Sequence, residues 1–304
     1  MNKIIIGARG SQLSLAQTKI VEDLLIKQNP ALQIEIKVVK TTGDKNMNPV
    51  PLDTIGKGWF TKELDSELLL GKIDMAVHSL KDIPENLPRG LIISAIPKRE
   101  DAREVLISKN GIKLKDLKKG ARIGTDSIRR RVQIMQKRTD LTVESIRGNV
   151  PRRIEKLENG EYDALILASA GLIRLGLTSK IAEYYSPTDL VPSPGQGALA
   201  IVTKKSNNKL NRLLKKINHK QTILAVSAER AFSDSVGGGC KMPVGAYAIC
   251  AGEKLTLYGM LGSMNGENMI YDKIVGKITK PKTLGRTLAK RIIKRAQWYE
   301  IIKN

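Results

Sequence analysis

Aromatic residues are scarce in this chain, which has 2 Trp, 7 Tyr and 2 Phe among 304 residues. Its cores must therefore be mainly aliphatic, and a base-stacking surface for single-stranded nucleic acid has few residues to draw on. No apolar run approaches the roughly 20 residues that a membrane-spanning helix needs. The apolar segment at residues 4–6 is also too short for a signal peptide. The sequence thus predicts a soluble, cytoplasmic protein.

Cysteine and histidine are equally rare, with two of each. Cys240 and Cys250 are too few for a disulfide framework. Together with His78 and His219 they show no metal-ligand spacing, so we expect no metal site. His78 falls inside a strand pattern and is expected to be a structural histidine whose hydrogen bonds are satisfied. Cys250 falls in an alternating strand pattern and is expected to be inert.

Acidic residues are outnumbered, because 52 Lys and Arg face 30 Asp and Glu, for a formal net charge of +22. Nucleic acid is one partner that such a surplus fits, and a small polyanionic substrate is another. The lysines are scattered as pairs such as Lys118-Lys119 and Lys204-Lys205, without interleaved aromatic residues. We therefore assign the lysine excess to solvated surfaces and expect neither a nucleic-acid nor a membrane partner.

Short aliphatic strands alternate with amphipathic helices through the first two-thirds of the chain, which is typical of an α/β fold. Clear strands are residues 4–8, 34–38 and 121–124, and a clear helix is 128–137. Beyond residue 217 a helix, three strands and a basic helix predict a small α+β unit. The expected boundaries are domain 1 at 1–98 and 195–217, domain 2 at 99–194, and domain 3 at 218–304.

One local pattern occurs near the start of both α/β halves. Residues 6–7 followed by Ser11 resemble residues 123–124 followed by Ser127: a strand, a glycine turn, a hydroxyl cap and then a helix. Each half would thus present a helix N-terminus, with its unpaired N–H groups and positive dipole end, at the carboxyl edge of a sheet. Open α/β folds bind their ligands at that edge.

Cys240 has an unusual setting, because three glycines at 237–239 precede it and Lys241 follows. Glycines permit a tightly turned loop, and a neighbouring positive charge favours the reactive thiolate. A small buried residue in a turn is the alternative reading. The glycine run favours an exposed, functional thiol, since a core cysteine needs no such loop.

Arginines gather in turns and first helical turns, and Asp82 directly follows a strand end. The guanidinium fork matches carboxylate or phosphate, so several converging arginines imply a ligand with several such groups. A carboxylate at position 82 either serves a reacting cation or proton, or simply pairs with Lys81 in a solvated turn; the sequence leaves both open. The arginines concerned are Arg9, Arg129, Arg130, Arg147, Arg152 and Arg153, whereas Arg131 is expected to coat a helix end.

These segments together resemble the porphobilinogen deaminase family, also called hydroxymethylbilane synthase. The resemblance runs in order from residue 4 to about residue 245. The matching segments are IGARGS at 6–11, GKGWF at 56–60, VHSLKDIP at 77–84, GTDSIRR at 124–130, RGNV at 147–150, PGQG at 194–197 and GGC at 238–240.

The resemblance implies two periplasmic-binding-protein-like α/β domains around a cleft, plus a small α+β C-terminal domain that carries the cysteine. It also implies a monomeric transferase of tetrapyrrole and haem biosynthesis. A dipyrromethane cofactor would be joined to Cys240 through a thioether. Four porphobilinogen molecules would then add in turn, each losing ammonia, before the linear hydroxymethylbilane is released.

Site roles carry over from the family position by position. Asp82 matches the catalytic aspartate, which would stabilise the cationic azafulvene left by ammonia loss. The positions implied to hold the cofactor are Cys240, Lys81, Ser79, Thr125, Ser127, Arg129, Arg130, Arg147, Gly148, Ala168, Gln196 and Gly197. The positions implied to hold substrate are Arg9, Ser11, Phe60, Arg147, Arg153 and Arg174.

Two departures from the family pattern concern the second α/β half. Asp126 stands where the family usually has a serine, and a carboxylate there sits poorly near an anionic substrate unless it points away. Pro151-Arg152 follow residues 147–150 where the family usually has a threonine, which puts the local turn in question.

Two functions of other classes compete with the enzyme. A solute-binding module for a di- or tricarboxylate would share the capped helices and the arginines but gives no role to Cys240 or Asp82. A nucleic-acid binder is motivated by charge alone and lacks stacking residues.

Overall fold

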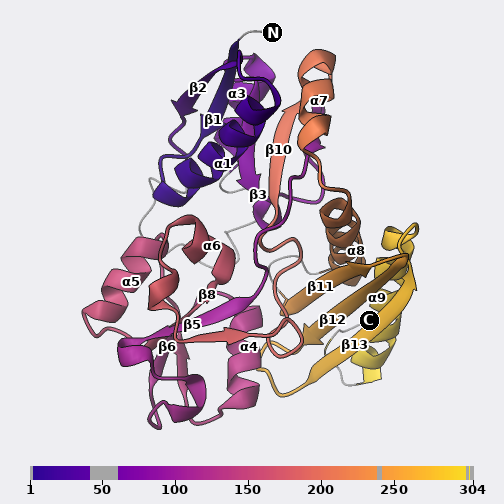
Figure 1. Ribbon diagram of the computed structural model, residues 1–304. Helices are drawn as coiled ribbons and strands as arrows, with labels where there is room; N and C mark the ends of the chain where they lie inside the picture. Colours follow the sequence, from indigo (N-terminus) through magenta and orange to yellow (C-terminus); the bar gives the residue numbers. More distant parts are fainter. Residues whose placement is uncertain (1–2, 42–60, 238–241, 299–300, 302–304) are drawn as a thin grey trace. The chain divides into compact units, whose positions relative to one another are not determined.

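The computed structural model describes residues 3–41, 61–237, 242–298 and 301. The chain divides into two compact units: residues 1–100 with 197–223, and residues 101–196 with 224–304. Figure 1 traces the elements of both along the sequence. The boundaries expected from the sequence for three domains therefore remain a prediction.

The first unit is built on a five-stranded sheet in the order β2-β1-β3-β10-β4. Strand β1 is parallel to β2 and β3, whereas β10 is antiparallel to both β3 and β4. The three parallel strands therefore end at one edge. The strands are β1 (Lys3–Ala8), β2 (Gln33–Val38), β3 (Met75–Ser79), β4 (Leu91–Ala95) and β10 (Leu199–Lys204).

Helices cover both faces of this sheet because side chains alternate along its strands. Ile4 and Ile6 of β1 share a core cluster with residues of α1 (Gln12–Gln28) and α7 (Asn208–Leu214). Gly7 follows Ile6 and therefore faces the other way, and it approaches Leu64 of α3 (Lys62–Leu70), so α3 lies on the opposite face. Short 3-10 turns complete the unit at η1 (Leu80–Asp82) and η5 (Lys215–Ile217).

The second unit holds another five-stranded sheet, in the order β7-β6-β8-β5-β9. Its strands are β5 (Glu104–Ser108), β6 (Arg122–Gly124), β7 (Thr142–Glu144), β8 (Ala164–Ala168) and β9 (Glu183–Tyr185). The helices are α4 (Ile128–Lys137), α5 (Val150–Glu158) and α6 (Ser169–Arg174), with 3-10 turns η2 (Lys109–Gly111), η3 (Leu114–Asp116) and η4 (Thr178–Lys180).

The two sheets have the same topology. Strand β6 is parallel to β7 and β8, as β1 is to β2 and β3, and β5 runs antiparallel between β8 and β9, as β10 does between β3 and β4. The local pattern seen in the sequence thus belongs to a repeat of whole domains. In both, the segment after the first parallel strand enters a capped helix.

The rest of the second unit is a three-stranded antiparallel meander, β11-β12-β13, whose core includes residues of two helices. The bounds are β11 (Val244–Ala251), β12 (Lys254–Gly262), β13 (Met269–Lys277), α8 (Lys220–Val236) and α9 (Pro281–Trp298). Both helices pack closely over Gly259 of β12: a Cβ added there would lie 2.8 Å from the Phe232 ring of α8 and 2.9 Å from the Leu288 side chain of α9. The predicted fold class, two α/β domains and a small α+β domain, is confirmed.

The close approach of α8 and α9 depends on Gly285. A Cβ added there would lie 2.8 Å from the Phe232 backbone nitrogen and closer still to the Ala228 carbonyl oxygen. Replacing glycine by alanine in a helix normally stabilises it. Here we expect Gly285→Ala to lower the free energy of unfolding by about 1–3 kcal/mol, because backbone must move.

Denaturant unfolding checks this expectation, with Thr287→Ala at an exposed position of the same helix as control. A Gly285→Ala variant more stable than the parent protein would show that the two helices do not approach so closely.

Candidate active site

The parallel strands of the first unit deliver polar residues to their common edge. Strand β1 ends at Ala8, and Ser11 caps α1 by accepting a hydrogen bond from the Ser14 backbone nitrogen at 3.3 Å. Ser14 Oγ accepts in turn from the Arg9 backbone N–H at 3.1 Å. The turn that carries Arg9 is therefore fixed by two hydroxyl groups.

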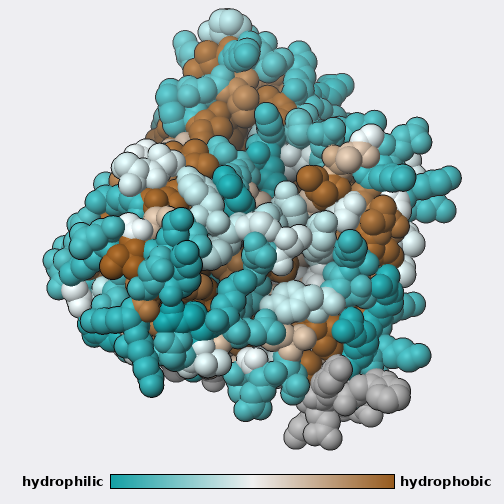
Figure 2. Space-filling view, turned by 60° about the horizontal axis from the view of Figure 1, so that its bottom comes forward, coloured by the Kyte–Doolittle hydropathy of each residue, from teal (hydrophilic) through white to brown (hydrophobic). Residues whose placement is uncertain are grey.

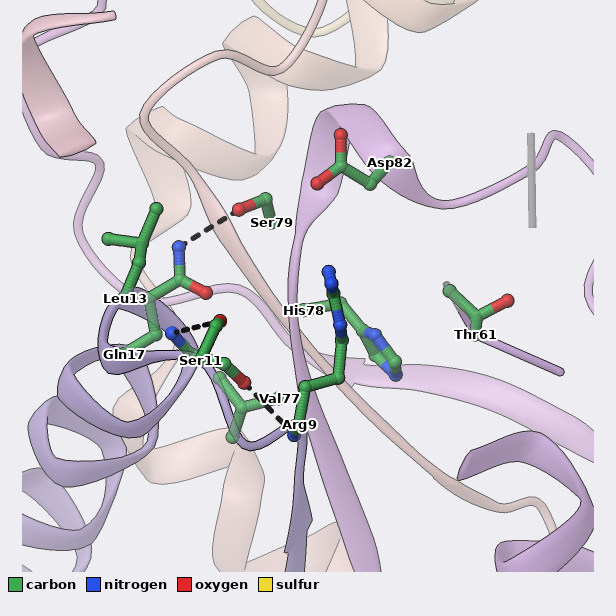
Figure 3. Close-up of a pocket in the computed structure, with 10 residues that line it drawn as sticks. Arg9, Ser11, Leu13, Gln17, Thr61, Val77, His78, Ser79 and Asp82 are labelled. Atoms are coloured by element: carbon green, nitrogen blue, oxygen red, sulfur yellow. Dashed lines mark hydrogen bonds between the residues drawn. The ribbon is translucent and has the colours of Figure 1, made fainter. Parts of the chain in front are cut away.

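A cavity of about 80 Å³ opens at this edge (Figure 3). Four residues predicted to form the site line it: Arg9, Ser11, Ser79 and Asp82. Figure 3 shows the Arg9 side chain rising through the middle, with Asp82 above, Ser79 and Ser11 on one side and His78 on the other. The remaining lining residues are Leu13, Ser14, Gln17, Thr61, Val77 and His78.

Asp82 lies in η1, directly after β3. Although part of its side chain is exposed, the surrounding protein displaces water, and this desolvation raises the pKa of its carboxyl. The positive charges of Lys81 and Arg9 act in the opposite direction. Lys81, a predicted cofactor-binding residue, thus sits within electrostatic reach of Asp82. If Asp82 were only a solvated turn residue, nothing would require it to line this cavity.

Gln17 was not predicted as a site residue, yet it positions one. Its side chain is buried, and Gln17 Nε2 donates to Ser79 Oγ at 2.9 Å. Ser79 therefore has its own O–H left to donate. The two residues are 62 positions apart in the sequence, so only the fold reveals the pair.

His78 departs from the expectation of a satisfied structural histidine. It is 6% exposed, and its Nε2 has no hydrogen-bond partner among the described residues. Burial, and then the charge of Arg9, lowers the pKa of the imidazole to about 4, so the ring is neutral at physiological pH.

The second unit presents its predicted residues at the equivalent edge. Thr125 follows β6, and its backbone N–H donates to the Glu144 carbonyl at the end of β7 at 2.8 Å. Ser127 caps α4 by accepting from the Arg130 backbone nitrogen at 3.4 Å. Gly148 has φ +112°, which favours glycine, in the loop between β7 and α5. Arg147 precedes it, and Ala168 ends β8.

Arg129 and Arg130 are buried and share one carboxylate. Arg129 Nη2 lies 2.5 Å from Glu104 Oε1, and Arg130 Nη2 lies 2.8 Å from Glu104 Oε2. Arg129 also donates to the Val191 carbonyl at 2.6 Å, and Arg130 to the Ile166 carbonyl at 3.0 Å. Two cations and one anion leave this cluster with a positive charge. Burial lowers the pKa of Arg129, and Glu104 opposes that shift.

Asp126, the first departure from the family pattern, is held within its own domain. It accepts a hydrogen bond from Ser145 Oγ, and its Oδ2 lies 3.7 Å from Arg153 Nη2. Arg153 is oriented further by its Nε, which donates to the Gly148 carbonyl at 2.8 Å. The carboxylate is thus paired with a predicted substrate-binding arginine.

Pro151, the second departure, fits the local turn. It lies in the first turn of α5, where a missing N–H costs nothing. Asn149 caps this helix by accepting from the Arg152 backbone nitrogen at 3.1 Å. The turn in question therefore forms.

The remaining residues predicted to bind cofactor or substrate, Arg174, Gln196 and Gly197, lie in other segments of the chain. Arg174 ends α6 and is half-buried. Gln196 is fully buried and donates through Nε2 to the Ala102 carbonyl at 2.8 Å. Gly197 has φ +83°. The preceding turn is fixed by Glu229 of α8, which accepts from the backbone N–H of Gly195 at 2.7 Å.

Cys240 and Phe60, both predicted site residues, lie outside the described residues. The second cysteine, Cys250, lies in β11, where burial and the nearby Glu229 carboxylate raise the pKa of its thiol. Such a thiol is a poor nucleophile at neutral pH.

Three further observations on the described residues concern membrane-spanning helices, metal-binding groups and the polarity of the surface. No helix in the described ranges has the length and apolar character to cross a membrane. Within the same ranges, no three His, Cys, Asp or Glu side chains gather in a group that could hold a metal ion. Most of the face drawn in Figure 2 is hydrophilic, and hydrophobic side chains form separate patches on it.

Two α/β domains present cations and hydroxyl groups at strand ends, one with a carboxylate beside them, an arrangement that suits an anionic ligand. Comparison with known families identifies the chain further. Residues 4–212 match the family described as porphobilinogen deaminase, dipyromethane cofactor binding domain, and residues 223–294 match the porphobilinogen deaminase C-terminal domain. The chain belongs to the porphobilinogen deaminase family, which confirms the predicted family and function.

Individual relatives agree over nearly the whole length. The chain is 42% identical to a porphobilinogen deaminase of Clostridioides difficile over 98% of this chain and 99% of the relative. It is 42% identical to that of Oceanobacillus iheyensis over 96% of this chain and 94% of the relative. Among solved structures, an arginine-specific periplasmic binding protein of Salmonella typhimurium aligns over 73% of this chain and 94% of its own, with 14% identity and a TM-score of 0.42.

The buried cluster makes a prediction about stability. Glu104→Gln keeps the side-chain shape but removes the counter-charge of two buried guanidinium groups. We expect the free energy of unfolding to fall by about 3–5 kcal/mol, the usual cost of breaking a buried ion pair.

The matched control is Asp140→Asn, which removes the partner of the more exposed Arg138 and should change stability little. Urea unfolding measures both. Equal, small effects of the two substitutions would mean that Glu104 does not neutralise the arginines.

Proposed function

We propose that this chain is a hydroxymethylbilane synthase, a transferase that condenses four porphobilinogen molecules on a dipyrromethane primer. Each addition releases ammonia, and hydrolysis frees the linear tetrapyrrole for porphyrin and haem biosynthesis. Membership of the family supports the reaction class. The observation that carries the proposal is the cavity that Arg9 and Asp82 share, because it offers both a carboxylate-binding cation and an anion for a reacting cation.

Asp82 is the proposed catalytic residue. Loss of ammonia from porphobilinogen leaves a cation, which a fixed carboxylate stabilises without having to reorganise. A raised pKa also lets this carboxyl hold a proton at a higher pH than an ordinary aspartate, so proton exchange with a reacting group is easier. Lys81 and Arg9 limit that shift and keep the ionised form available.

The dipyrromethane group is proposed to be attached through Cys240. Its chemical contribution when bound is a free pyrrole carbon that accepts the next porphobilinogen. The donor set of the chain fits a group with several carboxylates, because the second unit gathers guanidinium and hydroxyl groups at one sheet edge. The proposed holding residues described there are Thr125, Ser127, Arg129, Arg130, Arg147, Gly148, Ala168 and Gln196, with Ser79, Lys81 and Gly197 in the first unit.

Cys240 is favoured over Cys250 for the attachment by electrostatics. Burial and Glu229 disfavour the thiolate of Cys250, whereas Lys241 follows Cys240 in the sequence. Each added porphobilinogen brings an acetate and a propionate. Arg9, Ser11, Phe60, Arg147, Arg153 and Arg174 are the proposed substrate-binding residues. The family resemblance supports a monomer, and the two-cysteine composition supports a cytoplasmic location.

The reaction is tested by incubating the purified protein with porphobilinogen and measuring released ammonia and linear tetrapyrrole. We expect Asp82→Asn to fold normally and to lower kcat by at least about 100-fold, since it removes the charge while keeping the shape. Glu85→Gln, three residues further on and exposed, is the matched control and should turn over like the parent protein. Near-normal turnover by Asp82→Asn would refute the role of Asp82, and no turnover by the parent protein would refute the proposed function.

A further inference from the structure

His78 places an unused polar atom at the cavity of the first unit. The side chain comes from β3, lines the cavity, and lies beside Arg9 in Figure 3. The side chain is only 6% exposed, and its Nε2 has no hydrogen-bond partner in the described parts of the chain. Buried polar nitrogens are nearly always hydrogen-bonded, because leaving one unpaired is costly. The atom therefore calls for a partner that the described residues do not contribute.

The protonation state of the ring limits what that partner can be. The imidazole is neutral above about pH 4, because burial and the Arg9 charge disfavour a second cation there. A neutral imidazole has one N–H donor and one acceptor nitrogen. Nε2 is thus either a donor to an anion or an acceptor for an N–H group.

The charges around the cavity decide between the two. Arg9 lines it and attracts a carboxylate, whereas Asp82 already provides an acceptor for a pyrrole N–H. His78 stands on the Arg9 side of the cavity wall, close enough for the guanidinium charge to act on its ring. A carboxylate drawn to Arg9 therefore enters the cavity that His78 also lines.

We propose that His78 is a substrate-binding residue whose Nε2–H donates a hydrogen bond to a carboxylate arm of a pyrrole ring in this cavity, alongside Arg9. This inference rests on the proposed function and adds a specific recognition group to it. The imidazole contributes a directed hydrogen bond without a second positive charge. A cation there would compete with Arg9 for the same oxygen atoms and would weaken the field that Asp82 exerts on a reacting cation.

Steady-state kinetics with porphobilinogen test the binding role. His78→Phe keeps an aromatic ring but removes the donor, and we expect KM to rise about 10- to 100-fold with kcat within a few-fold of the parent protein. His78→Gln carries an amide nitrogen at a similar distance from the backbone and should recover most of the affinity. A purely structural role would instead change stability and lower kcat and affinity together, without rescue by glutamine.

Nitrogen NMR of ¹⁵N-histidine-labelled holoenzyme provides a second readout, which does not depend on any His78 variant folding. The chain has only two histidines, and His219, whose Nδ1 lies 2.8 Å from Thr222 Oγ1, is assigned with His219→Asn. The probe is a pyrrole with acetate and propionate arms but no aminomethyl group, so that it binds without condensing. We expect the protonated Nε2 signal of His78 to shift on addition, while His219 stays unchanged.

Two results overturn the inference: an unchanged KM in His78→Phe, or an unchanged His78 Nε2 signal at saturating probe. Either can occur while the parent protein still converts porphobilinogen, so failure of the inference is distinguishable from failure of the proposed function. That second failure shows as absent turnover and absent binding in the parent protein itself.

Discussion

The parallel pairing of three strands in each α/β domain determines where chemistry can occur. Because β1, β2 and β3 run the same way, their following segments meet at one edge, and the same holds for β6, β7 and β8. Arg9 and Asp82 are 73 positions apart in the numbering yet line one cavity for this reason. The antiparallel strands β10 and β5 begin at that edge, since Leu199 pairs with Ser79 and Glu104 pairs with Ala168, so the segments that precede them also reach it.

Charge is handled differently at the two edges. In the second domain, Glu104 neutralises part of the charge of Arg129 and Arg130, and Asp126 lies near Arg153. These pairs hold guanidinium groups in fixed orientations while leaving a net positive cluster, which suits repeated binding and release of carboxylates. In the first domain, His78 beside Arg9 is neutral and adds no charge to the cavity.

Local signals in the sequence predicted much of this arrangement. The strand, glycine turn and hydroxyl cap around Ser11 and Ser127 are contiguous, so their structure follows from short-range rules, and both caps form. The helix at 128–137 has the predicted bounds. The family motifs gave the residues of the cavity, including Arg9, Ser79 and Asp82.

Long-range pairs could not be predicted in the same way. Gln17 with Ser79, and Glu104 with Arg129, depend on which strands become neighbours. His78 illustrates the opposite error, because its place in a strand pattern suggested a satisfied ring, and only the folded surroundings show that Nε2 has no partner among the described residues. Whether a polar atom is paired is a property of the three-dimensional neighbourhood rather than of sequence type.

The central claim is that an oligopyrrole with several carboxylates is tethered to this chain while its arms are held by fixed donors. Intact-mass spectrometry of protein exposed to porphobilinogen tests it most directly. The account predicts an added mass of two linked pyrrole rings in the parent protein and in Cys250→Ala, and none in Cys240→Ala. A parent protein with the bare polypeptide mass, or an added mass that survives in Cys240→Ala, would contradict it.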